Sequence, residues 1–308
     1  MTKIKRVKTR VFALLSGGLD SILAIKILQK QGIEITGLSF VSYFFNVDSA
    51  KKAAEQLKIE LREIDFSDEH FEMIKNPKYG YGKAMNPCID CHILMLRKAK
   101  KLMDKEAGVY LNQFVCTGEV LGQRPMSQNK QSLDLIEKES GLKGYLLRPL
   151  SAKFLEPTIL EKKGLVDRNK LFDISGRSRK EQMALAKKWG IKEYPSPAGG
   201  CILTDFQFGV RLKELLQKWP DAQSNDIKLL RFGRHFWVEN EKIIVGRNKQ
   251  ENGQIKKLSK KGDTIIEPKE FPGPTILIKS RENISEKSLI KAKELMIKYS
   301  PKMKNKIK

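Results

Sequence analysis

The stretch Val11–Leu28, VFALLSGGLDSILAIKIL, decides the fold. Its first part, Val11–Leu15, is a short apolar run with the length of a buried strand. Apolar residues then recur through Leu19–Lys30 with the spacing and length of a helix. Ser16-Gly17-Gly18 lies between the two, so this stretch predicts a strand, a glycine turn and a helix.

Strand-like and helical runs keep alternating through the first half of the chain. The expected strands are Ile33–Phe40, Leu61–Phe66, Phe114–Thr117 and Tyr145–Leu150, and the expected helices are Asp48–Leu57 and Ile89–Lys105. Such alternation is typical of βαβ units, in which helices cover both faces of a parallel sheet. The predicted fold class is α/β, with a doubly wound parallel sheet.

The pattern changes after about residue 220. The expected elements there are a hairpin of His235–Val238 and Lys242–Val245, the strands Gly262–Glu267 and Thr275–Lys279, and a last basic helix after the capping box Asn283–Glu286. These elements predict a smaller C-terminal α+β domain. We therefore divide the chain into a catalytic domain, 1–204, and a second domain, 205–308.

Charge and composition narrow the classes of partner. The chain has 308 residues, 40% of them apolar, and a net charge of +23. Residues 206–308 carry 24 Lys and Arg against 12 Asp and Glu, a net +12. Self-repulsion of this size favours a polyanionic partner, most simply RNA, over a merely solvated or heat-adapted surface. No signal peptide or membrane span is visible, so a soluble cytoplasmic protein is expected.

The glycine turn has the chemistry of a phosphate site. Glycines let the backbone approach a phosphate, and the following helix directs free N–H groups at it. The Ser16 and Ser21 hydroxyls add donors, and Asp20 is expected to act through Mg²⁺ or to orient the loop. The alternative is an ordinary strand–turn–helix connection that binds no ligand. The Gly-Lys-Ser/Thr ending of a Walker loop is absent.

Ser16-Gly17-Gly18-Leu19-Asp20-Ser21 resembles the SGGxDS signature of the PP-loop ATP pyrophosphatases. The resemblance implies that these residues bind ATP, which is cleaved between its α and β phosphates to adenylate a substrate oxygen. Further nucleotide contacts are expected from Thr117-Gly118-Glu119, and more weakly from Ser39 and Phe40. Both segments end predicted strands and so share the carboxyl edge where open α/β sheets bind ligands.

Three cysteines form a second candidate site. Cys88 and Cys91 are spaced C-x-x-C, and Cys201 follows two glycines. Three thiolates could hold one metal centre with an open coordination position. A redox-active pair and a structural zinc site are alternatives, although the nearby His92 is poorly placed as a fourth zinc ligand. Cys116 lies in an apolar strand and is expected in the core.

The cysteine pattern resembles that of iron–sulphur-dependent tRNA thiolation enzymes. That resemblance implies a 4Fe-4S cluster on Cys88, Cys91 and Cys201, and it makes these cysteines and Asp20 the catalytic residues. The cluster-free tRNA 2-thiouridylases and 4-thiouridine synthetases, which carry a persulphide, are the nearest alternative. Either implies sulphur transfer to an adenylated uridine from hydrosulphide or a sulphur-carrier protein. Arg148-Pro149-Leu150 also resembles a segment of tRNA thiolases.

This interpretation predicts that the three cysteines lie beside the Ser16–Ser21 loop. Two other classes stay open at this stage, a PP-loop ligase or amidotransferase acting on a small molecule and a non-catalytic RNA-binding protein. The first lacks a glutaminase-like portion, and the intact loop argues against the second. A homodimer is possible.

Candidate RNA contacts lie in both halves. Arg177 and Arg179 could bind RNA phosphates, or could simply begin a solvated helix behind the capping box Ser178–Glu181. Residues 233–249 and 271–274 resemble the NFACT-R RNA-binding module over about 205–280. Stacking and phosphate neutralisation are expected there, and one of the two aromatic rings is expected to belong to the hairpin core instead. The candidates are Arg231, Arg234, Phe236, Trp237, Arg247 and Lys249.

Overall fold

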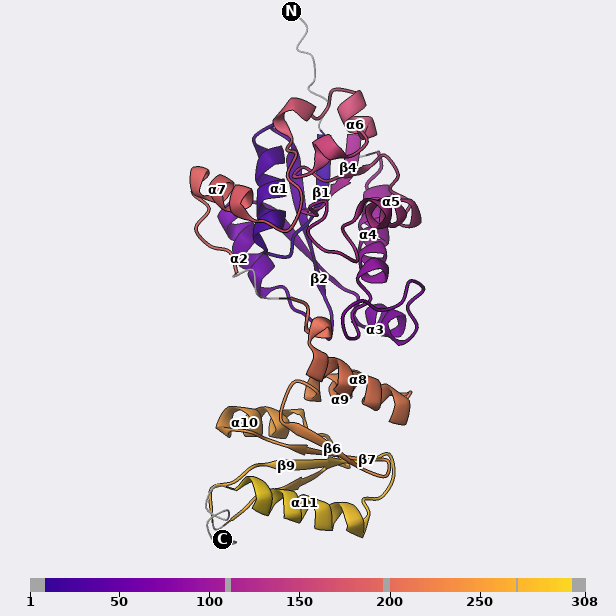
Figure 1. The fold of residues 1–308 in the computed structure, drawn as a ribbon, viewed down its shortest axis with the longest axis vertical. Coiled ribbons are helices and arrows are strands. Elements are labelled where there is room, and N and C mark those ends of the chain that lie inside the picture. The colour runs from indigo at the N-terminus through magenta and orange to yellow at the C-terminus, as the bar shows by residue number, and fades with distance from the viewer. Residues whose placement is uncertain (1–8, 109–111, 196–199, 270, 301–308) are drawn as a thin grey trace, which may run out of the picture. The chain divides into compact units, whose positions relative to one another are not determined.

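The computed structural model describes residues 9–108, 112–195, 200–269 and 271–300 (Figure 1). It divides the chain into two compact units, Met1–Thr204 and Asp205–Lys308. The sequence of residues 194–201, YPSPAGGC, also predicts a turn, and residues 302–308 form a lysine-rich tail. Part of that turn and the whole tail lie outside the described residues. Each unit is described by itself.

A parallel five-stranded sheet in the order β3-β2-β1-β4-β5 forms the centre of the first unit. Its strands are β1 Thr9–Leu14, β2 Glu34–Val41, β3 Glu60–Asp65, β4 Asn112–Cys116 and β5 Leu146–Leu147. The central strand β1 pairs with β2 on one side and β4 on the other. Because the chain moves outward from β1 in both directions, the crevice between β1 and β4 is a topological switch point, where such sheets bind ligands.

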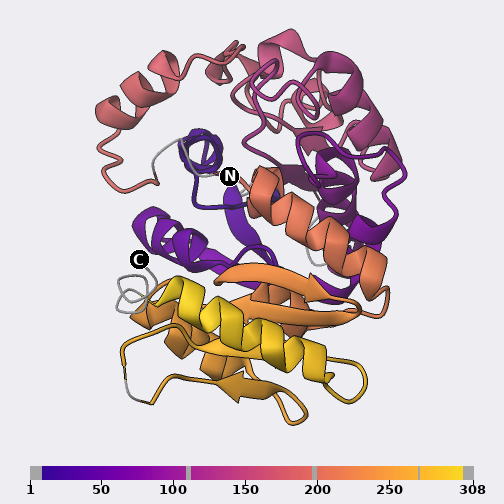
Figure 2. The same cartoon turned by 60° about the horizontal axis from the view of Figure 1, so that its bottom comes forward.

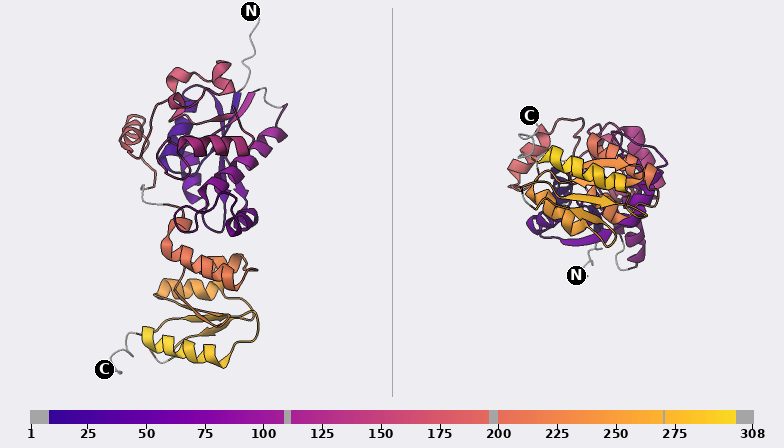
Figure 3. Two further views of the ribbon diagram at one scale, coloured as in Figure 1. Left: turned by 45° about the vertical axis from the view of Figure 1, so that its right-hand side comes forward. Right: turned by 90° about the horizontal axis from the view of Figure 1, so that it is seen from below.

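Helices cover both faces of this sheet, which confirms the doubly wound α/β class (Figures 1 and 3). Apolar residues of α1, α2 and α7 pack on one face, and those of α4 and α5 pack on the other. The helices are α1 Leu19–Gln29, α2 Asp48–Leu57, α3 Ser67–Lys75, α4 Cys88–Lys105, α5 Lys130–Glu139, α6 Ile159–Lys162 and α7 Lys180–Lys188. Short 3-10 turns are η1 Ala152–Phe154, η2 Arg168–Lys170 and η3 Ile202–Thr204.

Two expectations for this unit were wrong in detail. The strand expected at Tyr145–Leu150 is only Leu146–Leu147, since Pro149 lacks the N–H that a longer ladder needs. The capping box expected at Ser178 is absent, and α7 has Arg179 as its N-cap without a side-chain hydrogen bond. Helices α3 and α5 were not predicted.

The second unit is an antiparallel four-stranded sheet in the order β6-β7-β9-β8. The strands are β6 Arg234–Val238, β7 Glu241–Val245, β8 Thr264–Ile266 and β9 Ile276–Lys279, and the helices are α8 Phe206–Lys218, α9 Ser224–Leu229, α10 Lys249–Leu258 and α11 Glu286–Tyr299. Helix α11 lies across one face, and residues of α9 and α10 pack on the other (Figure 2). The expected α+β architecture is confirmed.

The last helix begins differently from the expectation. Its N-cap is Ser285, whose side chain accepts from Ser288 N, so Asn283 is not the cap. Ser and Asn are both good N-caps, and the register of the apolar face that packs on β7 and β9 decides between them. Within the part of the chain that the structure describes, no helix is long and apolar enough to cross a membrane.

Candidate active site

A cavity of about 520 Å³ opens at the carboxyl ends of β1, β2 and β4 in the first unit. Segments that are far apart in the sequence line it, among them the turn after β1, the end of β2, the start of α4, the stretch after β4, Arg179 before α7, and residues 200–204. Among its lining residues are Ser16, Gly18, Leu19, Asp20, Ser21, Ser39, Phe40, Cys88, Cys91, Thr117, Gly118, Glu119 and Cys201. The two candidate sites inferred from the sequence therefore share one wall, while the role of each residue stays a prediction.

Two glycines bring these segments together. Gly17 has φ +80°, and a Cβ there would lie 2.4 Å from the carbonyl group of Ser49 at the start of α2. A Cβ on Gly118 would lie 2.5 Å from the backbone N of Ser21 in α1. Only glycine fits either place. Gly17 thus shapes the turn from behind and is not among the residues that line the cavity.

The turn leaves the start of α1 open toward the cavity. Gly18 is the N-cap and provides no side-chain hydrogen bond to the first turn of the helix. The Ser21 hydroxyl donates to the Gly18 carbonyl at 2.8 Å, and the Ser16 hydroxyl accepts from the Gly18 N–H at 3.3 Å. Backbone N–H groups without a capping side chain are available to an anion, and the helix dipole favours one there. This geometry fits the phosphates of a nucleotide.

Asp20 is tied to two other segments. Its Oδ2 accepts from Gln123 Nε2 at 2.8 Å and from Arg179 Nη2 at 3.2 Å. Gln123 Oε1 in turn accepts from Gln182 Nε2 at 3.2 Å. The Asp20 Oδ1 atom is buried and has no hydrogen-bond partner among the described residues. A free carboxylate oxygen is a ligand that Mg²⁺ prefers, so the site fits the predicted ion through this atom.

Glu119 belongs to a buried charge network. Its Oε1 lies 2.7 Å from His92 Nδ1, and its Oε2 accepts from Arg148 Nε at 2.9 Å and from Thr117 Oγ1 at 3.0 Å. Burial would raise the pKa of Glu119, but Arg148 and His92 outweigh it and lower the pKa to about 2. Glu119 is therefore ionised and held in place. The sequence suggested Glu119 but gave no sign of His92 as its partner.

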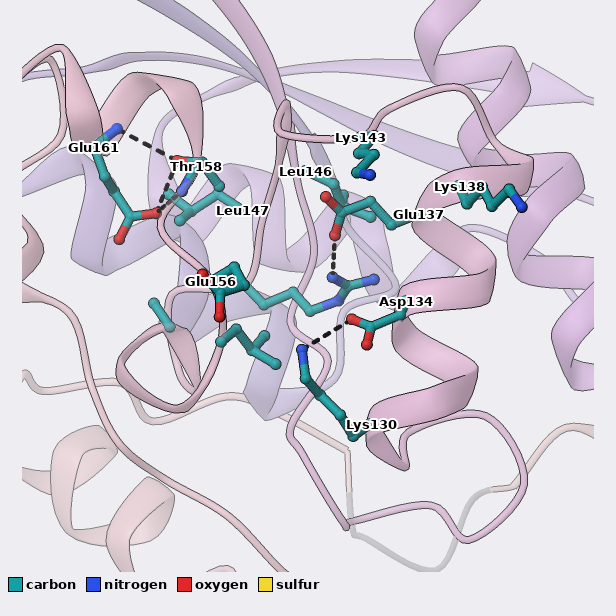
Figure 4. Close-up of a pocket in the computed structure, with 13 residues that line it drawn as sticks. Lys130, Asp134, Glu137, Lys138, Lys143, Leu146, Leu147, Glu156, Thr158 and Glu161 are labelled. Atoms are coloured by element: carbon teal, nitrogen blue, oxygen red, sulfur yellow. Dashed lines mark hydrogen bonds and ion pairs between the residues drawn. The ribbon is translucent and has the colours of Figure 1, made fainter.

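Arg148 also reaches toward a second cavity. Its Nη1 donates to Glu137 at 3.0 Å, and Glu137 lines a cavity of about 360 Å³ beside β5 and α5 (Figure 4). Charged side chains of both signs surround this cavity, and Figure 4 shows Lys130 paired with Asp134. The arginine thus joins the wall of the candidate active site to α5, and the second cavity contains none of the predicted site residues.

An aromatic wall lies near the end of β2, where the sequence suggested Phe40 but not Phe45 or His70. Phe40, Phe45 and His70 line the cavity there. The His70 ring stacks on Phe66 at 4.8 Å, and its Nδ1 lies 2.7 Å from the Ser42 hydroxyl. Burial lowers the pKa of His70 to about 4, so the ring is neutral near pH 7. Apolar and neutral surfaces of this kind suit a flat base.

The cysteines Cys88, Cys91 and Cys201 line the same cavity as the turn. Cys88 begins α4 and accepts from Asn86 Nδ2 at 2.9 Å. Burial raises the pKa of Cys88, and it raises the pKa of Cys91 much further, where negative charge on Cys201 or Cys88 would add to the effect. Cys91 is thus close enough to each of the other two thiols for their charge to affect its pKa. Cys116 is buried in the core, as expected.

Three neighbouring thiols are the donor set that iron–sulphur clusters use, so the residue types fit such a group. In the described residues, however, no three His, Cys, Asp or Glu side chains are positioned to hold a metal ion. His92 is bonded to Glu119, and this explains why it does not complete a zinc site with Cys88 and Cys91. The cluster stays a prediction.

Some of the candidate RNA-binding side chains already interact with other residues of the protein, and others are exposed. Arg177 is exposed, whereas Arg179 lines the cavity beside Asp20. In the second unit Arg247 pairs with Glu251, and Arg234 lies 4.4 Å from the Tyr299 ring. The remaining candidates are Lys249, which is exposed, Arg231, which is half-buried, and the half-buried rings Phe236 and Trp237.

Both rings pack within the second unit. Phe236 contacts the core under α11, and Trp237 meets Trp219 edge-on at 5.1 Å. Only one of the two rings was expected to pack in the core, but both do. The reason is that His235 and Trp237, on the other face of β6, lie against α8 and its C-cap residue Trp219. A role of either ring in stacking on RNA stays a prediction.

Family comparison agrees with the fold. Residues 9–170 match the family described as the tRNA methyl transferase HUP domain, and the chain belongs to that family. Residues 233–308 match the NFACT protein RNA binding domain. The second match lies further along the chain than the 205–280 expected from the sequence.

Several curated proteins are similar over most of the chain. The tRNA-specific 2-thiouridylase MnmA of Caldicellulosiruptor saccharolyticus is 27% identical over 79% of this chain and 66% of its own. The tRNA-specific 2-thiouridylase MnmA 2 of Thermoanaerobacter sp. is 27% identical over 67% of this chain and 59% of its own. The chain thus spans two thirds or less of the length of these relatives.

Solved structures also resemble the chain. One is a 4-thiouridine synthetase–RNA complex with bound ATP, with a TM-score of 0.43 and 23% identity, covering 72% of this chain and 52% of that one. Another is the U34-tRNA thiolase NcsA from Methanococcus maripaludis with its [4Fe-4S] cluster, with a TM-score of 0.34 and 14% identity, covering 75% and 73%.

Proposed function

We propose that this protein is an ATP-dependent tRNA thiolase, which adenylates a carbonyl oxygen of a uridine and replaces that oxygen with sulphur. One observation carries the proposal: the Ser16–Ser21 turn and the three cysteines line the same cavity. A nucleotide-activating loop and a set of sulphur atoms are the two parts that such a reaction needs at one place. The similarity to 2-thiouridylases supports the same substrate class.

The first step uses the turn. The uridine oxygen attacks the α-phosphorus of ATP, the bond to the β-phosphate oxygen breaks, and its electron pair leaves with pyrophosphate. The N–H groups at the start of α1 would stabilise negative charge on the phosphates, and Asp20 Oδ1 is free to bind Mg²⁺. Ser39, Phe40 and the Thr117–Glu119 segment would form the rest of the nucleotide site.

The second step uses the cysteine side of the cavity. A hydrosulphide sulphur attacks the activated carbon, the C–S bond forms, and AMP leaves with the electrons of the C–O bond. Cys88, Cys91 and Cys201 would hold a 4Fe-4S cluster, which when bound supplies an iron atom that has no protein ligand and can accept sulphur. Without a cluster, a sulphur-carrier protein would transfer its persulphide sulphur to one of these thiols, and that outer sulphur would attack the activated carbon and displace AMP. A second cysteine would then attack the inner sulphur, which releases the thiouridine and leaves a disulphide that an external thiol reduces.

The second unit would bring the tRNA. It carries a net charge of +12 over residues 206–308, and residues 233–308 match an RNA-binding domain. Basic side chains bind the RNA backbone by displacing counterions, and this effect does not depend on sequence. The candidates named above, with Arg177 in the first unit, are the contacts we would test.

The test is a thiolation assay on anaerobically purified full-length protein. Unmodified tRNA, ATP, Mg²⁺ and sulphide are supplied. The tRNA is then digested, and its nucleosides are separated by chromatography and identified by mass spectrometry. The expected result is thiouridine formed together with AMP and pyrophosphate, and the retention of the nucleoside distinguishes 2-thiouridine from 4-thiouridine. Iron and acid-labile sulphide are measured on the same sample. A colourless, iron-free protein with full activity would refute the cluster, and no ATP-dependent thiouridine would refute the function.

A further inference from the structure

The cavity contains few cations for a ligand as negative as ATP. Among its lining residues that the structure describes, Arg124 and Arg179 are the basic side chains, and no lysine is present. A Walker loop provides a lysine for the β- and γ-phosphates, and this turn has none. Backbone N–H groups carry only partial charge, so a full cation is needed from elsewhere in the fold.

The two arginines lie in different parts of the cavity. Arg179 precedes α7, and its Nη2 donates to Asp20 Oδ2 at 3.2 Å, which places it at the first turn of α1. Arg124 lies close enough to Cys88 that its charge lowers the pKa of that thiol against the larger effect of burial. Arg179 is therefore on the phosphate side, and Arg124 is on the sulphur side.

The Asp20 carboxylate keeps a hydrogen bond when Arg179 moves away from it. Asp20 Oδ2 also accepts from Gln123 Nε2 at 2.8 Å, a shorter bond than the one from Arg179. Gln123 is fixed in turn by Gln182, which is fully buried on α7. The Arg179 side chain is about one fifth exposed and lines the cavity, so a ligand there can reach it.

We propose that Arg179 binds the β- and γ-phosphates of ATP and neutralises the pyrophosphate as it leaves, moving there from its resting partner Asp20. The inference rests on the proposed function. As the bond between the α-phosphorus and its bridging oxygen breaks, the electron pair remains on pyrophosphate, and the planar guanidinium donates two N–H bonds to that growing charge. Asp20 keeps the Gln123 bond on Oδ2 when Arg179 leaves, and its Oδ1 stays free for Mg²⁺.

This role differs from the RNA contact that the sequence suggested for Arg179. The ion pair with Asp20 holds the side chain inside the cavity. Arg177, two residues earlier, is exposed and remains the candidate for RNA. Two arginines that look equivalent in the sequence would therefore act on different ligands.

The test compares Arg179→Ala, Arg179→Lys and the control Lys180→Ala in the full chain. Lys180 is exposed and adjoins Arg179. Pyrophosphate release is measured against ATP concentration, tRNA binding by filter retention, and folding by thermal unfolding. We expect Arg179→Ala to lower kcat/KM for ATP roughly 100-fold, with losses in both ATP affinity and kcat, because the guanidinium binds the phosphates of bound ATP and the charge that it stabilises grows in the transition state.

Arg179→Lys should recover part of the rate, since it restores the charge but not the fork of two donors. Lys180→Ala should match the parent protein, and the tRNA dissociation constant of Arg179→Ala should be unchanged. Normal pyrophosphate kinetics in a folded Arg179→Ala variant would overturn the inference, as would a loss confined to tRNA affinity. If the parent protein itself releases no pyrophosphate with tRNA, the proposed function fails instead. Direct measurement of ATP affinity in the variants then still decides whether Arg179 binds phosphate.

Discussion

Replacing Arg148 with methionine tests the buried network that holds Glu119. The arginine and the glutamate are 2% and 5% exposed, so the pair is screened little by water. Relative to the unfolded value of 4.5, a pKa of about 2 for Glu119 corresponds to about 3 kcal/mol of stability at pH 7, at 1.36 kcal/mol per pKa unit. Arg148→Met leaves Glu119 and Glu137 without this partner, and breaking a buried pair commonly costs about 3–5 kcal/mol. We therefore expect the free energy of unfolding to fall by about 3 kcal/mol or more at pH 7.

The pH dependence gives this prediction its sign. The pKa of Glu119 is lower in the folded protein than in the unfolded chain. Its stabilisation is therefore complete above pH 4.5 and is lost as the pH falls toward 2. The difference in free energy of unfolding between the parent protein and Arg148→Met should be largest near pH 7 and should become smaller below pH 4.5.

Urea unfolding at pH 7 and at pH 4 measures this gap. The matched control is Lys130→Ala, which breaks the exposed pair with Asp134 on α5 and should cost less than about 0.5 kcal/mol at either pH. A loss in Arg148→Met no larger than that of the control would refute the reasoning, as would a loss that is the same at both pH values.

Three further predictions follow from the cavity. Serine at Cys88, Cys91 or Cys201 should abolish thiouridine formation but leave adenylation, which is measured as tRNA-dependent pyrophosphate release. Loss of both activities would contradict the proposal that the turn adenylates and the cysteines transfer sulphur. Gly118→Ala should weaken ATP binding and cost about 1–3 kcal/mol of stability, because its Cβ would lie 2.5 Å from Ser21 N, and unchanged ATP affinity would be the contrary result. The free energy of unfolding should fall less between pH 6.5 and pH 4 in His70→Phe than in the parent protein. In that range the unfolded chain protonates His70, whereas the buried ring, with a pKa of about 4, stays neutral. The same fall in both proteins would show that His70 does not cause it.

The sequence predicts those parts of the structure that depend on neighbours in the chain. Helix α2 is found at the predicted bounds, Asp48–Leu57, because four buried residues recur on one side of it and its other face is polar. The turn at Ser16–Ser21 is recognised from six adjacent residues. Helix α3 was missed because its burial depends on the aromatic residues of a different segment, which stack around His70. Nothing within 67–75 shows that these contacts exist.

The same distinction separates the predicted site residues from those that were missed. Ser16, Cys88 and Thr117 could be proposed because each lies in a short local motif. Gln123, His92 and Gln182 carry no motif, and their importance comes from hydrogen bonds to residues that are distant in the chain.

Asp20 shows most clearly where sequence reasoning stops. Its bond to Gln123 spans 103 residues, and its bond to Arg179 spans 159. From the sequence, Asp20 was expected to bind Mg²⁺ or orient the loop, while Arg179 was assigned to RNA. The fold places both on one hydrogen-bonded network, and the two assignments then depend on each other. If Arg179 moves to the departing pyrophosphate, Asp20 loses the positive charge beside it but keeps its bond from Gln123. Its carboxylate would then hold Mg²⁺ more strongly, while the guanidinium stabilises the charge that develops on the phosphates.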